Sequence, residues 1–138
     1  FCYRSSNLEG KIIYQVKLGL YPEDPQKIRA QFLKIWTQKS RSQPLDMPSA
    51  GCIFKNPPGQ SAGRLIEQAG LKGISIGGAT VSTVHANFII TQEGATAVDV
   101  YTLINRIRRQ VADRFGVELE TEIKLWGRQH TRNPEPTF

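Results

Sequence analysis

The stretch SAGCIFKNP, residues 49–57, is the most informative segment of this chain. An apolar pair is enclosed by a glycine and by Asn-Pro, with a thiol at its entrance and a cation and a carboxamide just beyond. Glycine lets a backbone approach a ligand closely, and the residue before a proline is held extended. Side chains alternate in an extended segment, so Cys52 and Phe54 are expected on one side and Lys55 on the other. Spacing alone fits either a ligand-facing corner or an ordinary turn.

The segments around this stretch predict short strands and helices in an irregular order. Pro25 at a helix start, with Ile28, Phe32, Ile35 and Trp36 at helical spacing, predicts a helix to about residue 39 with these four side chains in the core. The other expected elements are strands over 11–20, within 71–84, over 86–91 and over 117–125, and helices over 61–70 and 96–116. Asp24 is the expected cap of the first helix, Thr96 with Asp99 a weak capping box for the last, and Gly116 its exit. Apolar residues at 100, 103, 104, 107 and 111 predict the stripe of that last helix, and apolar and charged residues alternate over 117–125. This order favours an α+β fold, a small sheet packed with helices, over a doubly wound sheet.

Composition limits the class of protein. The chain has 138 residues and a net charge of +6, so it is about one domain that suits anionic partners. No apolar run approaches the roughly 18 residues of a membrane span. Cys2 and Cys52 have neither metal-type spacing nor a disulfide framework, which favours a reducing, cytoplasmic setting. The chain opens with Phe1 and shows no signal-peptide pattern, so we expect a piece of a longer protein.

Seven separated segments resemble one family, in the family's order along nearly the whole chain. They are Tyr3-Arg4-Ser5-Ser6, Arg41-x-Gln43-Pro44-Leu45, 48–57, 62–73, Ile76-Gly77-Gly78-Ala79, Ser82-x-x-His85-Ala86-Asn87-Phe88, and Leu119-Glu120-x-Glu122-Ile123 with Gly127. The family is UDP-N-acetylenolpyruvoylglucosamine reductase, the flavoenzyme that completes UDP-N-acetylmuramate for bacterial peptidoglycan. Any one segment is weak support, but together they make a specific match.

The resemblance implies that the flavin-binding region lies mainly upstream. Residues 1–21 would end that region, 22–127 would be the substrate-binding domain, and 128–138 would be a tail. By this resemblance, the full enzyme would use NADPH to reduce FAD, the flavin would give hydride to C3 of the enolpyruvyl group, and a protein acid would protonate C2. The fragment alone is expected to lack FAD and turnover. Its expected partners are UDP-N-acetylglucosamine-enolpyruvate and the missing N-terminal FAD-binding domain, with no metal, nucleic acid or membrane.

Three side chains carry the catalytic roles that the resemblance implies. Arg4, a planar and permanently charged fork, would stabilise the charge that develops next to C2. Cys52 stands where the family has Ser or Cys and would give C2 its proton, since a thiol is mostly protonated at neutral pH. Glu122 would steady the enediol and its hydrogen bonds with Arg4. Taken singly, each residue also fits a purely structural interpretation: Arg4 as a surface cation, Cys52 as a small buried hydrophobic residue, and Glu122 as a solvated carboxylate.

Substrate binding is expected from Arg41, Lys55 and Asn56, which suit a diphosphate, and from Gln68, which could read a hydroxyl or an amide. His85 and Asn87 flank a predicted buried strand, where packing and ligand contact remain equally open. An alternative from another class is a basic α+β nucleic-acid-binding module, because arginines gather on the 96–116 helix at 106, 108, 109 and 114. Against it, no aromatic platform is interleaved with them. A purely structural partner domain is a third possibility.

Overall fold

Residues 7–8 and 11–125 are described in the computed structural model of the chain, which divides into two units, residues 1–33 and 34–138. In the first unit, residues 11–20 form no strand, so that prediction is wrong. They are exposed, with Ile12 at 93%. A strand has no hydrogen bonds within itself and forms only when another strand pairs with it. No strand among the described residues pairs with this stretch.

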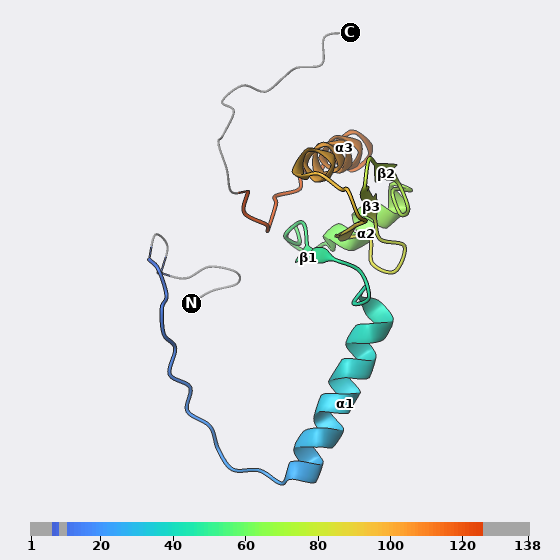
Figure 1. The fold of residues 1–138 in the computed structure, drawn as a ribbon. Coiled ribbons are helices and arrows are strands. Elements are labelled where there is room, and N and C mark those ends of the chain that lie inside the picture. Colours follow the sequence, from blue (N-terminus) through green and yellow to red (C-terminus); the bar gives the residue numbers. More distant parts are fainter. Residues whose placement is uncertain (1–6, 9–10, 126–138) are drawn as a thin grey trace. The chain divides into compact units, whose positions relative to one another are not determined.

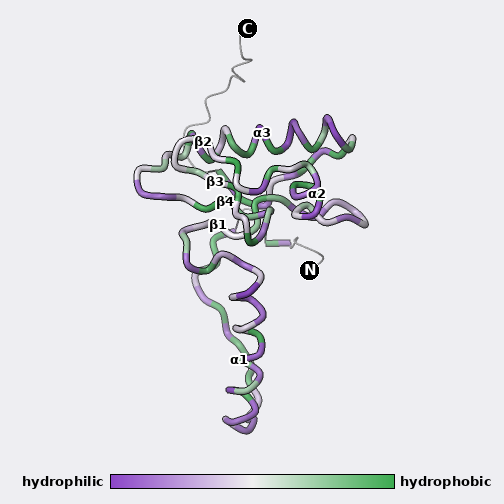
Figure 2. The backbone as a smooth tube through the Cα atoms, turned by 90° about the vertical axis from the view of Figure 1, so that its right-hand side faces the viewer, coloured by the Kyte–Doolittle hydropathy of each residue, from purple (hydrophilic) through white to green (hydrophobic). Residues whose placement is uncertain are grey.

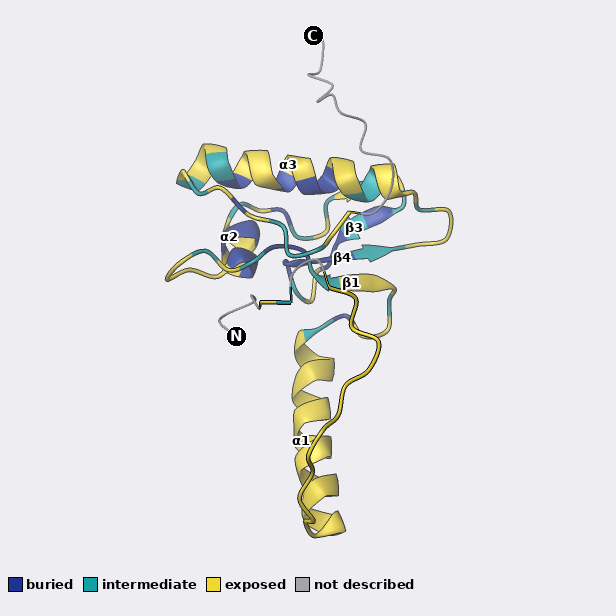
Figure 3. Cartoon of the chain, turned by 90° about the vertical axis from the view of Figure 1, so that its left-hand side faces the viewer, coloured by how far each residue is buried: buried dark blue, intermediate teal, exposed yellow. Residues whose placement is uncertain are grey.

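Helix α1 (Pro25–Ser42) begins where the sequence indicates and runs three residues further than predicted. The carboxylate of Asp24 caps it, accepting the Gln26 backbone N–H at 2.9 Å. None of its residues is buried, and Figure 3 shows it exposed along its length. The predicted core positions are therefore wrong for the described chain: Ile28, Phe32, Ile35 and Trp36 are between 48% and 60% exposed. Their spacing is that of an apolar helix face, which needs a partner surface to become core.

The second unit contains an antiparallel sheet, of which Figure 1 labels β1, β2 and β3. Its strands are β1 (Ser49–Cys52), β2 (Ser75–Ile76), β3 (Ala79–Val81) and β4 (Phe88–Thr91), in the spatial order β1-β4-β3-β2. The short helix α2 (Ala62–Gln68) is capped by Ser61, whose side chain accepts the Arg64 N–H, and the chain turns at Gly70 with a φ of 77°. The α+β fold is confirmed.

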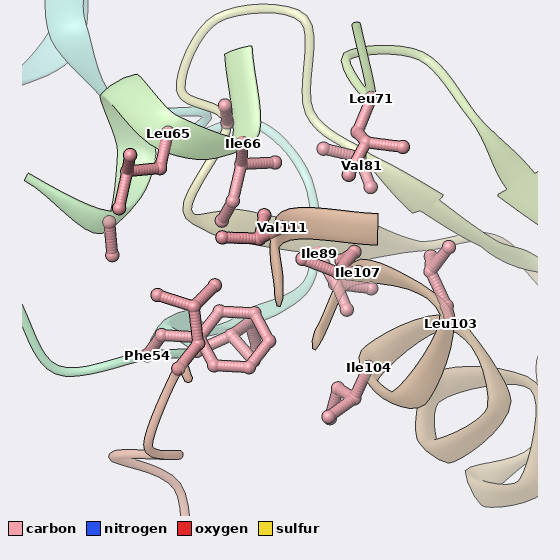
Figure 4. Packing of buried hydrophobic residues seen from close by; sticks show 14 of the residues in the cluster. Phe54, Leu65, Ile66, Leu71, Val81, Ile89, Leu103, Ile104, Ile107 and Val111 are labelled. Atoms are coloured by element: carbon pink, nitrogen blue, oxygen red, sulfur yellow. The ribbon is translucent and has the colours of Figure 1, made fainter. Parts of the chain in front are cut away.

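Helix α3 (Ala97–Phe115) covers the sheet and contacts both β2 and β3. The predicted apolar stripe is confirmed, because the buried residues of α3 are Leu103, Ile104, Ile107 and Val111. Figure 2 shows the apolar side of α3 turned toward β3 and the polar side turned away. In Figure 4 this stripe points into one interior together with Leu65 and Ile66 of α2. The core therefore lies between α3, α2 and the sheet.

The predicted strand over 117–125 is reduced to a single antiparallel bridge, Phe54 with Thr121. Its alternation still describes which residues pack, because Leu119 is buried and Val117 and Ile123 pack partly against the core. On the other face, Glu122 is only partly exposed and its Oε2 atom is buried. The bridge places this segment beside the stretch that follows β1.

The N-terminus of α3 is tied to the turn between β2 and β3 by one carboxylate. Asp99 accepts N–H groups from Thr96 at 2.9 Å and from Gly78 at 3.3 Å, and the Thr96 side chain accepts the Asp99 N–H, completing a capping box. The close approach requires glycine, because a Cβ on Gly78 would lie 2.6 Å from the Ala95 backbone. These N–H groups, that of Thr96 most and then that of Gly78, hold the pKa of Asp99 below its ordinary value.

We predict that Asp99→Asn destabilises the chain at neutral pH, and that its deficit relative to the parent shrinks in acid. A pKa lower in the folded state gives stability that is complete above the unfolded value of about 4 and is lost as the pH falls through the folded value. Urea unfolding of both proteins between about pH 7 and pH 2.5 measures the difference. Asp113→Asn, which removes an exposed carboxylate 3.9 Å from Arg109, is the control. A deficit that stays constant with pH contradicts the prediction.

Candidate functional site

The residues that follow β1 lie between two neighbouring segments. On one side, the Ile53 N–H donates to the Asn87 carbonyl at 2.8 Å. On the other, the Lys55 N–H donates to the Glu120 carbonyl at 2.9 Å, and the Glu122 N–H donates to the Ile53 carbonyl at 2.8 Å. The backbone of Glu122 is therefore bonded to the residue next to Cys52.

Cys52 is the last residue of β1, opposite Phe88 of β4. Its thiol is free and its side chain is partly buried. The residue before it, Gly51, has a φ of 80°, in the left-handed region that favours glycine, and the register of β1 with β4 is irregular between Ser49 and Cys52. The irregularity sets the direction of the chain as it enters Cys52. The two residues after it, Ile53 and Phe54, are each 1% exposed, so simple alternation of inside and outside fails here.

Lys55 and Asn56 follow in the same stretch, and both already have partners in the fold. The Lys55 ammonium is paired with the Glu120 carboxylate. The Asn56 side-chain oxygen accepts the Ala62 N–H at 3.0 Å, at the first residue of α2. This bond uses the acceptor of the amide and not its NH₂ donors. The two residues therefore lie near Cys52 in the chain and also tie this stretch to the segment carrying Glu122 and to α2.

The other predicted site residues are placed elsewhere. Arg41 is exposed in the last turn of α1, and Gln68 is exposed at the last residue of α2. Within the described part of the chain, no hydrogen bond or ion pair joins either one to residues 52–56. Arg4 lies outside the described residues. The structure thus brings together the segments of Cys52, Lys55, Asn56 and Glu122.

His85 and Asn87, left open by the sequence, are packed and hydrogen-bonded. The Nδ1 atom of His85 accepts the Asn87 N–H at 3.2 Å, and its ring meets Phe88 edge-on with centroids 4.9 Å apart. Burial lowers the pKa of His85, chiefly by desolvation. Gly63 of α2 lies against the imidazole, because a Cβ there would come within 3.2 Å of His85 Cε1. The Asn87 side chain also bonds to the Phe54 N–H and carbonyl, and nothing in the spacing of the sequence predicts this contact.

A metal centre is not indicated, because no group of three or more His, Cys, Asp or Glu residues that could hold a metal ion occurs among residues 7–8 and 11–125. None of the helices that the structure describes has both the length and the apolar character needed to cross a bilayer. The fold and the site define a small α+β domain in which strand β1 ends at a cysteine. A lysine and a carboxamide follow that cysteine in the chain, and a carboxylate lies on the segment bonded to this stretch.

Comparison with known proteins places this domain. Residues 43–126 match the family model of the UDP-N-acetylenolpyruvoylglucosamine reductase C-terminal domain, and the chain belongs to that family. A reductase of this name from Symbiobacterium thermophilum is 50% identical over 129 residues, covering 92% of this chain and 42% of the relative. The reductase from Moorella thermoacetica is 47% identical over 128 residues, with the same two coverages. The resemblance seen in the sequence is confirmed.

A solved structure agrees. The crystal structure of UDP-N-acetylenolpyruvylglucosamine reductase from Thermus caldophilus matches with a TM-score of 0.68 and 40% identity, over 80% of this chain and 39% of that one. The chain therefore spans about two fifths of the length of the relatives it matches. Nothing among these findings supports the nucleic-acid alternative. Its arginines are exposed on α3, and Arg109 lies 3.9 Å from the Asp113 carboxylate.

Proposed function

We propose that this chain is the C-terminal, substrate-binding part of a flavin-dependent reductase that converts UDP-N-acetylglucosamine-enolpyruvate to UDP-N-acetylmuramate with NADPH, in the cytoplasm, for peptidoglycan synthesis. The observation that carries the proposal is the hydrogen bond from the Glu122 N–H to the Ile53 carbonyl, which joins the segment of the proposed proton donor to that of the proposed carboxylate. Membership of the family supplies the reaction class.

The chemistry explains the roles proposed for these residues. Reduction at C3 leaves carbanion character at C2, delocalised into the substrate carboxylate as an enediolate. Cys52 would donate the proton that C2 receives, and Glu122 would hold the hydrogen-bond network around the enediol. Arg4 would balance the extra negative charge. Lys55, Asn56 and Arg41 would bind the anionic UDP portion, and Gln68 a hydroxyl or amide of the sugar.

We propose that the residues near Cys52 face the substrate and do not hold the flavin. Their donor set is a thiol, a lysine, a carboxamide and a carboxylate, which suits an anionic substrate that must be protonated. We therefore assign FAD and NADPH to the part of the parent enzyme upstream of this chain. When bound there, the flavin would supply hydride. The boundaries we propose, 1–21 for the end of the flavin region and 22–127 for the substrate domain, contain the matched residues 43–126 in the second part.

The apolar face of α1 supports an N-terminal domain as the partner of this chain. Ile28, Phe32 and Trp36 are each more than half exposed, as is Leu20 in the preceding stretch. Apolar residues at helical spacing that remain exposed indicate a helix face that another surface covers. Because the matched relatives are more than twice as long as the region they share with this chain, their upstream part is the partner we propose for this face.

The function is tested by joining this chain to its upstream region and following NADPH oxidation. We expect oxidation that depends on the enolpyruvyl UDP-sugar and yields UDP-N-acetylmuramate. A restored protein that carries FAD and is reduced by NADPH, yet does not reduce the sugar, contradicts the proposal. Salt-sensitive binding of RNA or DNA in its place would favour the alternative class.

We predict that Lys55→Gln raises the KM for the UDP-sugar by about tenfold, the loss of one charge-assisted contact to phosphate. The matched control is Lys27→Gln, because Lys27 is also paired with a glutamate, Glu23 at 3.6 Å, but belongs to α1. Steady-state kinetics of the restored enzyme measure both variants. Equal KM values for the two would show that Lys55 serves only its ion pair with Glu120.

A further inference from the structure

Asn87 makes a two-point contact with the backbone of a single residue, Phe54. Its Oδ1 accepts the Phe54 N–H at 3.0 Å, and its Nδ2 donates to the Phe54 carbonyl at 2.8 Å. The residue is only 4% exposed and is one of two buried polar residues in the described part of the chain. An amide presents one donor and one acceptor side by side, so it pairs with a peptide group as a neighbouring strand does.

The contact comes at the place where the regular sheet stops. The pairing of β1 with β4 ends at Cys52 and Phe88. Beyond Cys52, the backbone groups of Phe54 that face β4 meet the Asn87 side chain, and the Ile53 N–H meets the Asn87 carbonyl at 2.8 Å. Asn87 therefore extends the sheet by one residue, using its side chain where a strand would use its backbone.

The opposite edge of the same stretch carries the segment of the proposed carboxylate. There the Ile53 carbonyl accepts the Glu122 N–H, and the Lys55 N–H donates to the Glu120 carbonyl. Residues 53–55 are therefore hydrogen-bonded to Asn87 on one edge and to the segment of Glu122 on the other. Asn87 itself is fixed by its neighbour, since its N–H donates to His85 Nδ1 at 3.2 Å.

We propose that Asn87 is a positioning residue for the protonation of C2, fixing the stretch between the Cys52 thiol and the Glu122 carboxylate. This inference rests on the function proposed above. Asn87 acts through Phe54 and Ile53 and needs no contact with substrate. Proton transfer requires a donor held within hydrogen-bond reach of the acceptor, and a shift of about 1 Å in a catalytic group costs on the order of 10²-fold in rate.

The chemistry of the contact makes asparagine specific. Aspartate has the same shape but no donor, so its carboxylate would face the Phe54 carbonyl oxygen and lose that bond. Serine is too short to bond both groups and would leave at least one buried backbone group unsatisfied. The variants Asn87→Asp and Asn87→Ser therefore weaken the same contact in two different ways.

The test uses the full-length reductase that carries this chain as its C-terminal part, because two half-reactions can be followed separately. In Asn87→Asp we expect the rate of substrate reduction to fall by about 10²-fold. The reduction of bound flavin by NADPH, which needs no proton from Cys52, should change less than about twofold, with KM for the UDP-sugar nearly unchanged. Asn105→Asp, the same substitution at an exposed position of α3, should leave both rates unchanged.

A second readout is independent of turnover. The alkylation rate of Cys52 by iodoacetamide, measured in a Cys2→Ser background, should rise in Asn87→Asp because the stretch after the thiol is released. If Asn87→Asp does not fold, Asn87→Ser is measured in its place. Unchanged substrate reduction, or equal loss in both half-reactions, overturns the inference. If the parent enzyme reduces flavin but never the UDP-sugar, the proposed function fails instead.

Discussion

Replacing Cys52 with alanine in the restored enzyme should lower the rate of substrate reduction by about 10²- to 10⁴-fold, the usual contribution of a positioned general acid. The thiol lies at the end of β1, partly buried, with the Glu122 backbone bonded to the next residue. Alanine removes the proton and almost no packing, so the fold and the reduction of flavin by NADPH should persist. Stopped-flow measurement of each half-reaction separates these effects.

Two further variants make the result interpretable. Cys52→Ser keeps a proton on a group of similar size and should retain most of the rate, since the family is expected to use either residue here. Ser49→Ala, at the exposed start of the same strand, should have no effect. Full activity in Cys52→Ala would remove Cys52 from the proton-transfer step and leave the thiol as a small packed side chain.

The features that the sequence predicted well are those set by local chemistry. The stop and cap before α1, the capping box of Thr96 with Asp99 and the exit at Gly116, whose φ is 66°, all follow from a few adjacent residues. The stripe of α3 follows from periodicity. A helix makes its backbone hydrogen bonds within itself, so the spacing of its apolar residues is enough to predict which face is buried.

The predictions that failed each needed a partner from a distant part of the chain. The stretch over 11–20 has β-branched and aromatic residues, yet no described strand pairs with it. The alternation over 117–125 indicated which residues pack, but not that pairing would shrink to the Phe54–Thr121 bridge. The contact of the Asn87 side chain with the Phe54 backbone was not predicted at all. It joins residues 33 positions apart, and no spacing rule describes such a contact.

The core of the second unit provides the largest expected effect on stability. Leu103 is completely buried, at 0% exposure, in the cluster between α3, α2 and the sheet. We expect Leu103→Ala to lower the free energy of unfolding by about 2–5 kcal/mol, through lost transfer energy and the cavity left behind. That is a large share of the 5–15 kcal/mol that typical domains have in total. Urea unfolding followed by circular dichroism gives the value.

The control lies five residues earlier, in the first turn of the same helix. Val98 is 70% exposed, so Val98→Ala should change the free energy of unfolding by less than about 0.5 kcal/mol, and alanine's higher helix propensity favours a small gain. A comparable loss in both variants would contradict the burial argument, because Val98 gives up no buried packing. A selective loss in Leu103→Ala is the expected result, because Leu103 packs in the same buried cluster as Ile53 and Phe54 of the stretch bearing Cys52.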